Sequence, residues 1–390
     1  MSKADCRTRI LYVDTGVSIA GGQISLIEIL KCLDTARFTP VVCSPGGSRM
    51  RAVCMERGVT WLPIPFRSIH VSSQAGDRVS GDRVSGGLKD AFGSLYGVFH
   101  LARLIRKHKI DIVHANNFKA ALIGGVASAL AGRPMIFHDR IHITHGALGW
   151  FTALLAARIV VVSRAVAAKH GRYMTRKVNL VYDGIDVDKF TARGESGQTN
   201  RVCYVGRISE EKAILRLVDA APLVLEHVPD ARFVVAGEPF TPDDEAYLEK
   251  IRQRIDKFGL AARFEFPGYV DDVPELLQSI SVFALPSRKE PLGLVVMEAM
   301  ALRKPVVAFD TGGPQEIVTN GDDGVLVKPG DVAAFADAIA GLLKDPGTAS
   351  RMGDKGRQTV VERFSSPIFV ERIMQVYDEI APPCAMRNCR

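Results

Sequence analysis

Short apolar runs alternate with amphipathic stretches along the whole chain. In the first half, strands are expected at Arg9–Asp14, Thr39–Cys43, Asp111–His114, Met135–His138 and Ile159–Ser163, with helices over Gln23–Leu33 and near Met50–Arg57. The second half restarts the rhythm, with predicted strands at Arg201–Val205, Arg232–Ala236, Arg263–Pro267, Val282–Leu285 and Val306–Phe309, each followed by a helical stretch. Alternation of this kind is typical of βαβ units and parallel sheets. The pattern therefore predicts an α/β protein with two doubly wound sheets.

Between the two halves lies a polar stretch, Thr191–Asn200, with two glycines and no apolar period. Such a stretch is typical of an interdomain linker. We therefore expect one domain over residues 1–190 and a second over 191–365. Residues 366–390 are expected to form a C-terminal helix that returns to the first domain, and a tail. The chain of 390 residues also exceeds what one hydrophobic core usually organises.

One segment differs from its surroundings in composition. Residues 76–85 read Gly-Asp-Arg-Val-Ser twice in succession, within a polar stretch that extends from Ser72 to Gly87. This composition predicts a mobile loop, which we place over the acceptor side of the first domain. The last ten residues have no pattern and are expected to fray.

The overall composition is that of an ordinary globular protein. Hydrophobic residues make up 47% of the chain and charged residues 24%, which argues against a disordered or fibrous chain. The longest apolar stretch, Ala147–Ser163, is interrupted by Arg158 and is too short to span a bilayer comfortably. The charged N-terminus disfavours a signal peptide. Seven scattered cysteines form no close metal-ligand pairs, and their odd number favours reduced thiols and the cytoplasm.

The charge is distributed unevenly. Residues 1–190 contain 26 Lys and Arg against 13 Asp and Glu, a balance of +13, whereas residues 191–390 contain 24 against 30, a balance of −6. One predicted helical segment carries basic residues beside apolar ones: Arg103, Arg106, Lys107 and Lys109 beside Leu101, Leu104 and Ile105. An anionic partner such as a membrane surface, a lipid phosphate or an acidic glycan would explain this distribution. Solvated charge, or cations at a helix C-terminus, would explain it equally well.

The strongest local signal is the run from Ser287 to Met300. It follows a predicted strand, so Glu290 lies at the strand's carboxyl end and Glu298 about one turn inside the next helix. In open α/β sheets ligands bind at this edge. Gly293 permits close approach of the backbone, and the amides of Leu294 and Val295 open the helix toward phosphate oxygens or sugar hydroxyls. On spacing alone, however, a glutamate near a helix terminus more often serves the helix dipole.

A second cluster follows the first strand of the second half. Arg207 and Lys212 lie in the strand-to-helix turn, where a guanidinium and an ammonium could hold a diphosphate. The alternative is a pair of surface cations that bind the neighbouring Glu210 and Glu211. A third turn, at Gly21 and Gly22, could supply backbone amides, but it lacks the Gly-x-Gly-x-x-Gly pattern of dinucleotide binding.

These motifs together resemble the retaining glycosyltransferases of family 4, which have the GT-B fold. The second half matches most strongly, at Gly206-Arg207 with Lys212, Glu290 with Glu298, Lys304–Val307, Gly312–Val318, Asn320-Gly321, Gly324–Val327 and Pro329–Asp331. The first half matches at Asp111–His114, His138-Asp139, Val161–Ser163 and Gly184–Asp186 with Phe190. The resemblance implies two Rossmann-like doubly wound domains facing a cleft, the first on the acceptor side and the second binding a nucleotide sugar.

The resemblance also implies roles for particular residues. Arg207 and Lys212 would bind the donor's diphosphate, next to Gly206, while Glu290 would bind the sugar hydroxyls and Glu298 the ribose hydroxyls. The amides from Gly293 to Val295 would stabilise phosphate and sugar groups, and those of Gly21 and Gly22 would cap the cleft opposite. His138 is the first candidate for a histidine near the reacting sugar, and His114 the second. Either histidine could equally be a satisfied core residue at a strand end.

The sequence departs from the family's usual pattern at four positions. His114-Ala115-Asn116 replaces a common His-x-His, so the role of the second histidine has no counterpart here. Asp183 stands where Asn is usual, Ala213 where Gly usually follows the lysine, and Leu292 where Phe is common. None of these changes removes a phosphate-binding or carboxylate group, so activity remains expected.

The implied reaction is transfer of a sugar from a UDP- or GDP-sugar to an acceptor hydroxyl, with retention of configuration and no metal or other cofactor. The acceptor is expected to be a glycan or lipid-linked molecule in cell-surface polysaccharide or glycolipid synthesis, handled in the cytoplasm or on the inner face of its membrane. No nucleic acid is expected. Asp186-Val187-Asp188, the one nearby Asp-x-Asp pair, is interpreted as structural. Two alternatives stay open: a glycoside hydrolase that uses Glu290 and Glu298, and a silent nucleotide-sugar-binding module.

Overall fold

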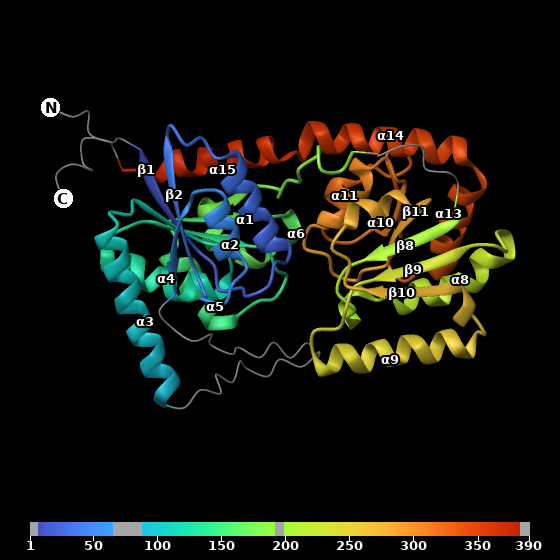
Figure 1. Ribbon diagram of the computed structural model, residues 1–390, viewed down its shortest axis with the longest axis horizontal. Coiled ribbons are helices and arrows are strands. Elements are labelled where there is room, and N and C mark those ends of the chain that lie inside the picture. The colour runs from blue at the N-terminus through green and yellow to red at the C-terminus, as the bar shows by residue number, and fades with distance from the viewer. Residues whose placement is uncertain (1–6, 65–87, 192–198, 383–390) are drawn as a thin grey trace. The chain divides into compact units, whose positions relative to one another are not determined.

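The computed structural model describes residues 7–64, 88–191 and 199–382. They form two compact units, of which unit 1 comprises residues up to Tyr182 together with those from Pro367 onward, and unit 2 comprises Asp183–Ser366 (Figure 1). The repeated Gly-Asp-Arg-Val-Ser segment, most of the predicted linker and most of the C-terminal tail lie outside the described residues.

Unit 1 is built on a parallel sheet whose described strands follow the order β3-β2-β1-β4-β5-β6-β7. Its strands are β1 (Thr8–Val13), β2 (Phe38–Ser44), β3 (Thr60–Pro63), β4 (Ile112–Ala115), β5 (Met135–Asp139), β6 (Arg158–Val161) and β7 (Val178–Leu180). Its helices are α1 (Gly21–Cys32), α2 (Met50–Glu56), α3 (Leu88–Lys107), α4 (Phe118–Ala131), α5 (Gly146–Leu155), α6 (Arg164–Ala167), α7 (Gly171–Met174) and α15 (Ser366–Ile380). The apolar runs of the central strands are buried on both faces, as parallel sheets require.

The two faces of this sheet receive different helices. Residues of α1, α2 and α15 form one apolar core with the side chains of one sheet face, including Leu26, Met50 and Phe369. On the other face α4 packs against β4 and β5 and lies between α3 and α5. Because side chains alternate along a strand, neighbouring residues at the end of β5 point into different layers.

Unit 2 repeats the plan with the strand order β10-β9-β8-β11-β12-β13. Its strands are β8 (Arg201–Val205), β9 (Arg232–Ala236), β10 (Phe264–Gly268), β11 (Val282–Leu285), β12 (Val306–Phe309) and β13 (Val325–Val327). Its helices are α8 (Leu215–His227), α9 (Pro242–Lys257), α10 (Val273–Gln278), α11 (Leu294–Ala301), α12 (Pro314–Ile317), α13 (Val332–Lys344) and α14 (Pro346–Arg363). In both units the order of strands reverses beside the first strand, which is the doubly wound arrangement. The predicted fold class is confirmed.

The ten predicted strands all form, each within two residues of its expected ends. The three strands without a prediction, β3, β7 and β13, lie at sheet edges and are three or four residues long. These strands are short and partly exposed; β3 and β7 also lack a continuous apolar run, whereas β13 is the apolar run Val325-Leu326-Val327, which is too short to predict a strand by itself.

The division between the units falls eight residues before the expected one, since unit 2 begins at Asp183 and not at residue 191. The contacts of the intervening residues explain the difference. Ile185 pairs with Ser365, and the carbonyl of Phe190 accepts a hydrogen bond of 2.9 Å from Arg357. The residues before the polar stretch are thus anchored to α14 and its C-terminal end.

Candidate active site

Lys212 and Glu290 meet at the carboxyl edge of the unit 2 sheet. Lys212 ends a short 3-10 turn after β8, and Glu290 lies in the loop between β11 and α11. Because β8 and β11 are neighbours in the sheet, these loops are adjacent. Lys212 Nζ donates a hydrogen bond of 2.6 Å to Glu290 Oε2, and the two side chains are only 20% and 9% exposed. The structure thus joins two predicted site residues that are 78 positions apart.

Arg207 lies at the same edge with a more exposed side chain. Its guanidinium is 3.7 Å from the carboxylate of Glu211, and both side chains are more than a third exposed. An exposed pair of this kind is weak, so the guanidinium can turn toward another anion. Arg207 therefore pairs with a glutamate in its own turn, as the alternative interpretation of the sequence expected. Lys212 instead bonds to Glu290 in the neighbouring loop.

Glycines hold the Glu290 loop in place by close backbone packing. Gly313 N donates a hydrogen bond of 2.8 Å to Glu290 O. A Cβ added at Gly312 would lie 2.2 Å from Glu290 O, and one added at Gly313 would lie 2.1 Å from Leu292 O. Gly293 caps α11 with a left-handed φ of +98°, which suits glycine. The amides of Leu294 and Val295 consequently begin α11 beside Glu290.

The loop after β8 depends on similar packing. A Cβ at Gly237 would lie 1.9 Å from Gly206 O, so the loops after β8 and β9 touch through backbone alone. The hydroxyl of Tyr204 donates a hydrogen bond of 2.9 Å to the carbonyl of Arg207. Ala213 has a φ of +51°, a left-handed conformation that costs a residue with a side chain about 1 kcal/mol. This cost explains physically why the family usually places glycine at that position.

Glu298 lies on α11, one turn beyond the helix start, and is 8% exposed. Burial raises its pKa from 4.5 to about 7, while the charge of Lys189 acts in the opposite direction. Burial has removed the water that would otherwise hydrogen-bond to this carboxylate. Ligand hydroxyls that donate hydrogen bonds to it would therefore stabilise its charged form strongly.

Glu298→Gln is expected to stabilise the protein at alkaline pH. The raised pKa means that the folded state holds a proton that the unfolded state releases between pH 4.5 and 7, so wild-type stability falls as pH rises through that window. Glutamine carries no such charge. We expect the variant to exceed wild type by up to about 3 kcal/mol at pH 8 and to match it near pH 4. Urea unfolding at both pH values measures this.

The matched control is Glu226→Gln, since Glu226 lies exposed on α8. This substitution should leave the pH dependence unchanged. Identical unfolding midpoints for wild type and Glu298→Gln at pH 8 would contradict the assigned burial of a charged carboxylate.

In unit 1 the two candidate histidines lie side by side on the face covered by α1 and α15. His114 Nε2 is 3.1 Å from His138 Nδ1, and His114 Nδ1 is 2.7 Å from the hydroxyl of Tyr377. Both rings are fully buried. Burial, together with the charge of Arg140, lowers the pKa of His114 to about 3 and the pKa of His138 well below its usual value. Both imidazoles are therefore neutral at physiological pH.

Arg140, the first residue after β5, sets the hydrogen-bond direction of this cluster. Its Nη2 lies 2.9 Å from His138 Nδ1. A guanidinium only donates, so His138 Nδ1 accepts and the neutral ring carries its proton on Nε2. His114 Nε2 lies 3.1 Å from the same nitrogen, and the Tyr377 hydroxyl beside His114 Nδ1 donates to the hydroxyl of Tyr12 at 3.1 Å. The fixed cation thus assigns the tautomer of His138.

A polar network connects this cluster to the first glycine turn. Asn116 Nδ2 donates to Gly22 O at 3.0 Å, and Asn116 Oδ1 accepts from Arg140 Nη1 at 2.8 Å. Gln23 Nε2 lies 3.0 Å from both carboxylate oxygens of Asp14, which is fully buried. Burial raises the pKa of Asp14, and hydrogen bonds from Gln23 and Asn116 lower it. Gly21 and Gly22 form the first turn of α1.

Asn116 occupies the position where the family often has a second histidine, and its amide bridges Arg140 to the glycine turn. Sequence reasoning missed Arg140, Tyr377 and Asn116 as members of this cluster. Arg140 could have been found from the sequence, because it lies just after a predicted strand. Tyr377 could not, since it comes from the C-terminal helix 263 residues after His114.

The Asp-x-Asp pair at 186–188 forms a local turn, in which Asp188 N donates to Asp186 Oδ1 at 3.2 Å. Among residues 7–64, 88–191 and 199–382, no group of three or more His, Cys, Asp or Glu side chains has an arrangement that could hold a metal ion.

Two family models match the chain. The model for glycosyl transferases group 1 matches residues 187–359, and the model for glycosyltransferase family 4 matches residues 19–189. The chain is 32% identical over 312 residues to the alpha-maltose-1-phosphate synthase of Mycobacterium tuberculosis, an alignment that covers 69% of this chain and 79% of the relative.

A second relative is the UDP-Gal:alpha-D-GlcNAc-diphosphoundecaprenol alpha-1,3-galactosyltransferase of Escherichia coli, 25% identical over 71% of this chain and 77% of the relative. Among solved structures, Anabaena HepE in complex with UDP and glucose superposes with a TM-score of 0.78 at 21% identity, over 95% of this chain and all of that one. This likeness shows the same fold.

Proposed function

This chain belongs to glycosyltransferase family 4, and from that premise we propose that it moves a sugar from a nucleotide-diphosphate sugar to an acceptor hydroxyl, with retention of configuration and without a metal ion. The chain is a glycosyltransferase of the GT-B fold. The observation that carries the proposal is the Lys212–Glu290 pair beside Arg207 at the carboxyl edge of the unit 2 sheet. The names of the E. coli relative and of the HepE complex support a UDP-sugar donor, and GDP-sugars remain the second class to test.

The residues of unit 2 suit the donor. Arg207 and Lys212 would bind the diphosphate, Glu290 the sugar hydroxyls and Glu298 the ribose hydroxyls. As the bond between sugar and phosphate breaks, negative charge grows on the diphosphate, and the two cations with the first amides of α11 stabilise it. Such groups accelerate the reaction because they bind the developing charge more strongly than the ground state.

The edge of unit 1 suits the reacting hydroxyls. His138 is neutral and carries its proton on Nε2, so it does not repel a developing sugar cation, but this buried nitrogen must be uncovered before it donates to a hydroxyl. The amides of Gly21 and Gly22 offer further donors. In the proposed reaction the departing phosphate takes the acceptor's proton on the same face of the sugar.

Full activity in excess EDTA is the expected result, because cationic side chains and amides supply the charge that a metal otherwise would. UDP- and GDP-sugars are first screened by thermal shift, and turnover of the binding donors is measured with and without chelator. Activity that EDTA abolishes and manganese restores would assign the chain to a metal-dependent mechanism. Sugar release from a glycoside without nucleotide would favour the hydrolase, and donor binding without any turnover would favour the silent module.

We further propose a glycan or lipid-linked acceptor in polysaccharide or glycolipid synthesis, on the inner face of the cytoplasmic membrane. The acceptor named for the E. coli relative supports this class. The described part of the chain contains no helix long and apolar enough to cross a membrane. On α3, Arg103 and Arg106 are exposed, whereas Leu101 and Ile105 are fully buried. The two buried residues pack inside the protein, whereas Leu95, Tyr96 and Phe99, nearer the start of α3, are 55%, 64% and 62% exposed, so α3 offers a membrane both charge and apolar surface.

A further inference from the structure

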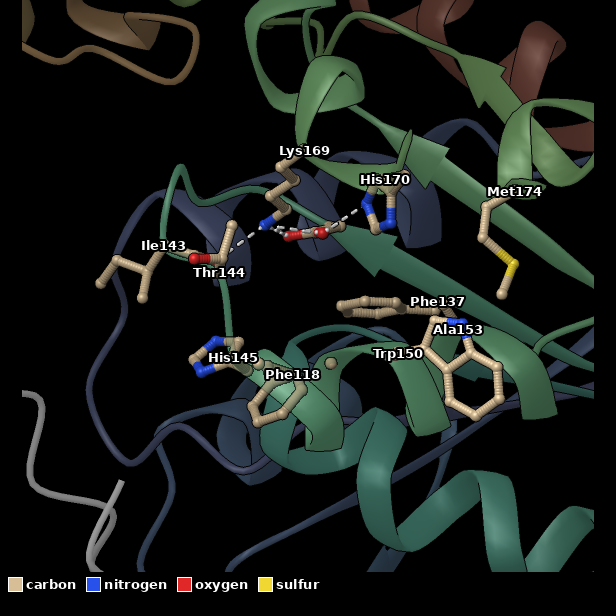
Figure 2. Close-up of a pocket in the computed structure, with 13 residues that line it drawn as sticks. Phe118, Phe137, Ile143, Thr144, His145, Trp150, Ala153, Lys169, His170 and Met174 are labelled. Carbon is tan, nitrogen blue, oxygen red and sulfur yellow. Dashed lines mark hydrogen bonds and ion pairs between the residues drawn. The ribbon is translucent and has the colours of Figure 1, made fainter. Parts of the chain in front are cut away.

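A cavity of about 150 Å³ lies in unit 1, on the face of β5 opposite to His138. It is bounded by the start of α4, the end of β5, α5 and the turn after α6. Figure 2 shows rings and aliphatic groups around most of it: Phe118, Phe137, Trp150, Ala153 and Met174. A cavity of this volume has room for a short hydrocarbon segment.

The polar groups at one end of the cavity are paired with one another. Asp139 accepts hydrogen bonds of 2.8 Å from both Lys169 and His170, and Lys169 also donates to Ile143 O at 3.2 Å. The dashed lines in Figure 2 follow this group. A ligand would gain little by breaking these bonds. Burial of apolar surface is therefore the main source of binding free energy that the cavity offers.

Helix α5, which forms one wall, presents apolar side chains to solvent. None of its ten residues is charged, and only Thr152 and Ala153 are buried. Trp150 is 60% exposed, Leu154 49% and Phe151 40%. Clustered apolar side chains on a surface mark a binding site for lipid or another apolar partner. Tryptophan in particular is common where an apolar phase meets water.

The chain around this helix is rich in basic residues, since residues 140–182 contain seven Lys and Arg and no Asp or Glu. Two of the seven are paired with acids from outside this stretch, Arg158 with Glu379 and Lys169 with Asp139. Arg164 and Arg176 are exposed among them. Basic residues beside an apolar surface favour a partner that is both apolar and anionic. A lipid that carries a phosphate has this combination, whereas a neutral glycan has neither property.

We propose that the cavity and the exposed face of α5 bind the hydrocarbon chain of a phosphate-bearing lipid, and that this lipid is the acceptor. A short stretch of the chain fills the cavity, the remainder lies along α5, and the phosphate lies among the basic residues that follow the helix. The claim that the acceptor uses this site rests on the proposed function. The claim that a phosphate-bearing lipid binds there does not, so lipid binding is tested separately.

The chain offers a direct optical probe, because Trp61 and Trp150 are its two tryptophans. In full-length Trp61→Phe, the emission of Trp150 is followed during titration with dodecyl phosphate below its critical micelle concentration. We expect a saturable blue shift, and quenching by 12-bromododecyl phosphate. Butyl phosphate should bind at least about tenfold more weakly, because each methylene removed from water contributes to affinity, and inorganic phosphate should leave the spectrum unchanged.

A cavity-filling substitution locates the site. In the same background, Ala153→Leu adds volume to the wall of the cavity and should weaken dodecyl phosphate binding about tenfold. Ala129→Leu makes the same change at an exposed position of α4 and should have no effect. If Ala153→Leu does not fold, the chain-length comparison and the bromine quenching still decide the matter.

Equal affinity for butyl and dodecyl phosphate, or an unchanged Trp150 spectrum, would overturn the proposal, as would equal binding by Ala153→Leu and Ala129→Leu when both fold. These titrations contain no donor, so they are independent of sugar transfer. Lipid binding without transfer to any lipid-linked acceptor would leave the binding site standing and remove the lipid as the acceptor.

Discussion

Lys212→Ala is expected to lower the turnover of sugar transfer by about a hundredfold or more while the fold survives. The ammonium is the partner that most directly balances charge on a departing diphosphate, and such groups contribute about 3 kcal/mol to the transition state. The substitution also leaves Glu290 buried, at 9% side-chain exposure, without its cation. Glu290→Gln should lower turnover by a similar factor because it removes the charge that holds Lys212.

The comparison of single and double variants tests the pair. Since the two side chains share a hydrogen bond of 2.6 Å, the double variant should lose much less activity than the product of the two single losses. Lys328→Ala, at an exposed position of unit 2, serves as the control and should retain wild-type turnover. Near-normal rates in a well-folded Lys212→Ala protein would remove this residue from the donor site.

Gly313→Ala is expected to damage both stability and donor binding. Gly313 has an ordinary helical φ of −61°, so the backbone itself tolerates a side chain. The surrounding atoms leave no room for it, however, since the added Cβ would lie 2.1 Å from Leu292 O and 2.2 Å from Leu292 Cα. The loop that carries Glu290 must then shift. We expect a loss of about 2 kcal/mol or more in the free energy of unfolding, with donor affinity reduced at least tenfold.

Gly341→Ala is the matched control, because a Cβ there meets nothing within 4 Å and the residue lies inside α13. It should stabilise the protein by about 0.5–1 kcal/mol, the usual helix preference for alanine over glycine. Urea unfolding and calorimetric titration with the donor measure both variants. A Gly313→Ala protein with wild-type stability and donor affinity would show that the loop does not depend on this backbone contact.

The sequence by itself determined the fold and the position of the candidate site. Long apolar runs buried on both sides of a parallel sheet are visible as continuous segments, which is why every central strand was predicted. The same pattern placed Lys212 and Glu290 at the carboxyl ends of β8 and β11. It did not reveal the short edge strands, whose residues are half exposed.

Only the tertiary structure decided which side chains meet. The ion pair of Lys212 with Glu290 depends on the adjacency of two strands, and the hydrogen bonds of His138 and His114 depend on Arg140 and on Tyr377 from α15. Contacts between residues far apart in the chain have no local signature, because each partner alone has the features of an ordinary surface or core residue.

The exposed apolar surface of unit 1 likewise could not be predicted from the sequence alone. The run that contains α5 and the helix that carries Leu101 and Ile105 both have apolar residues at helical spacing. Packing against α4 buries Leu101 and Ile105 completely, whereas Tyr96 and Phe99 on the same helix remain more than half exposed, as do Trp150 and, nearly, Leu154 on α5. Hydrophobic periodicity shows that a helix has an apolar side, but the neighbouring elements decide whether that side is buried in the protein or open to a ligand.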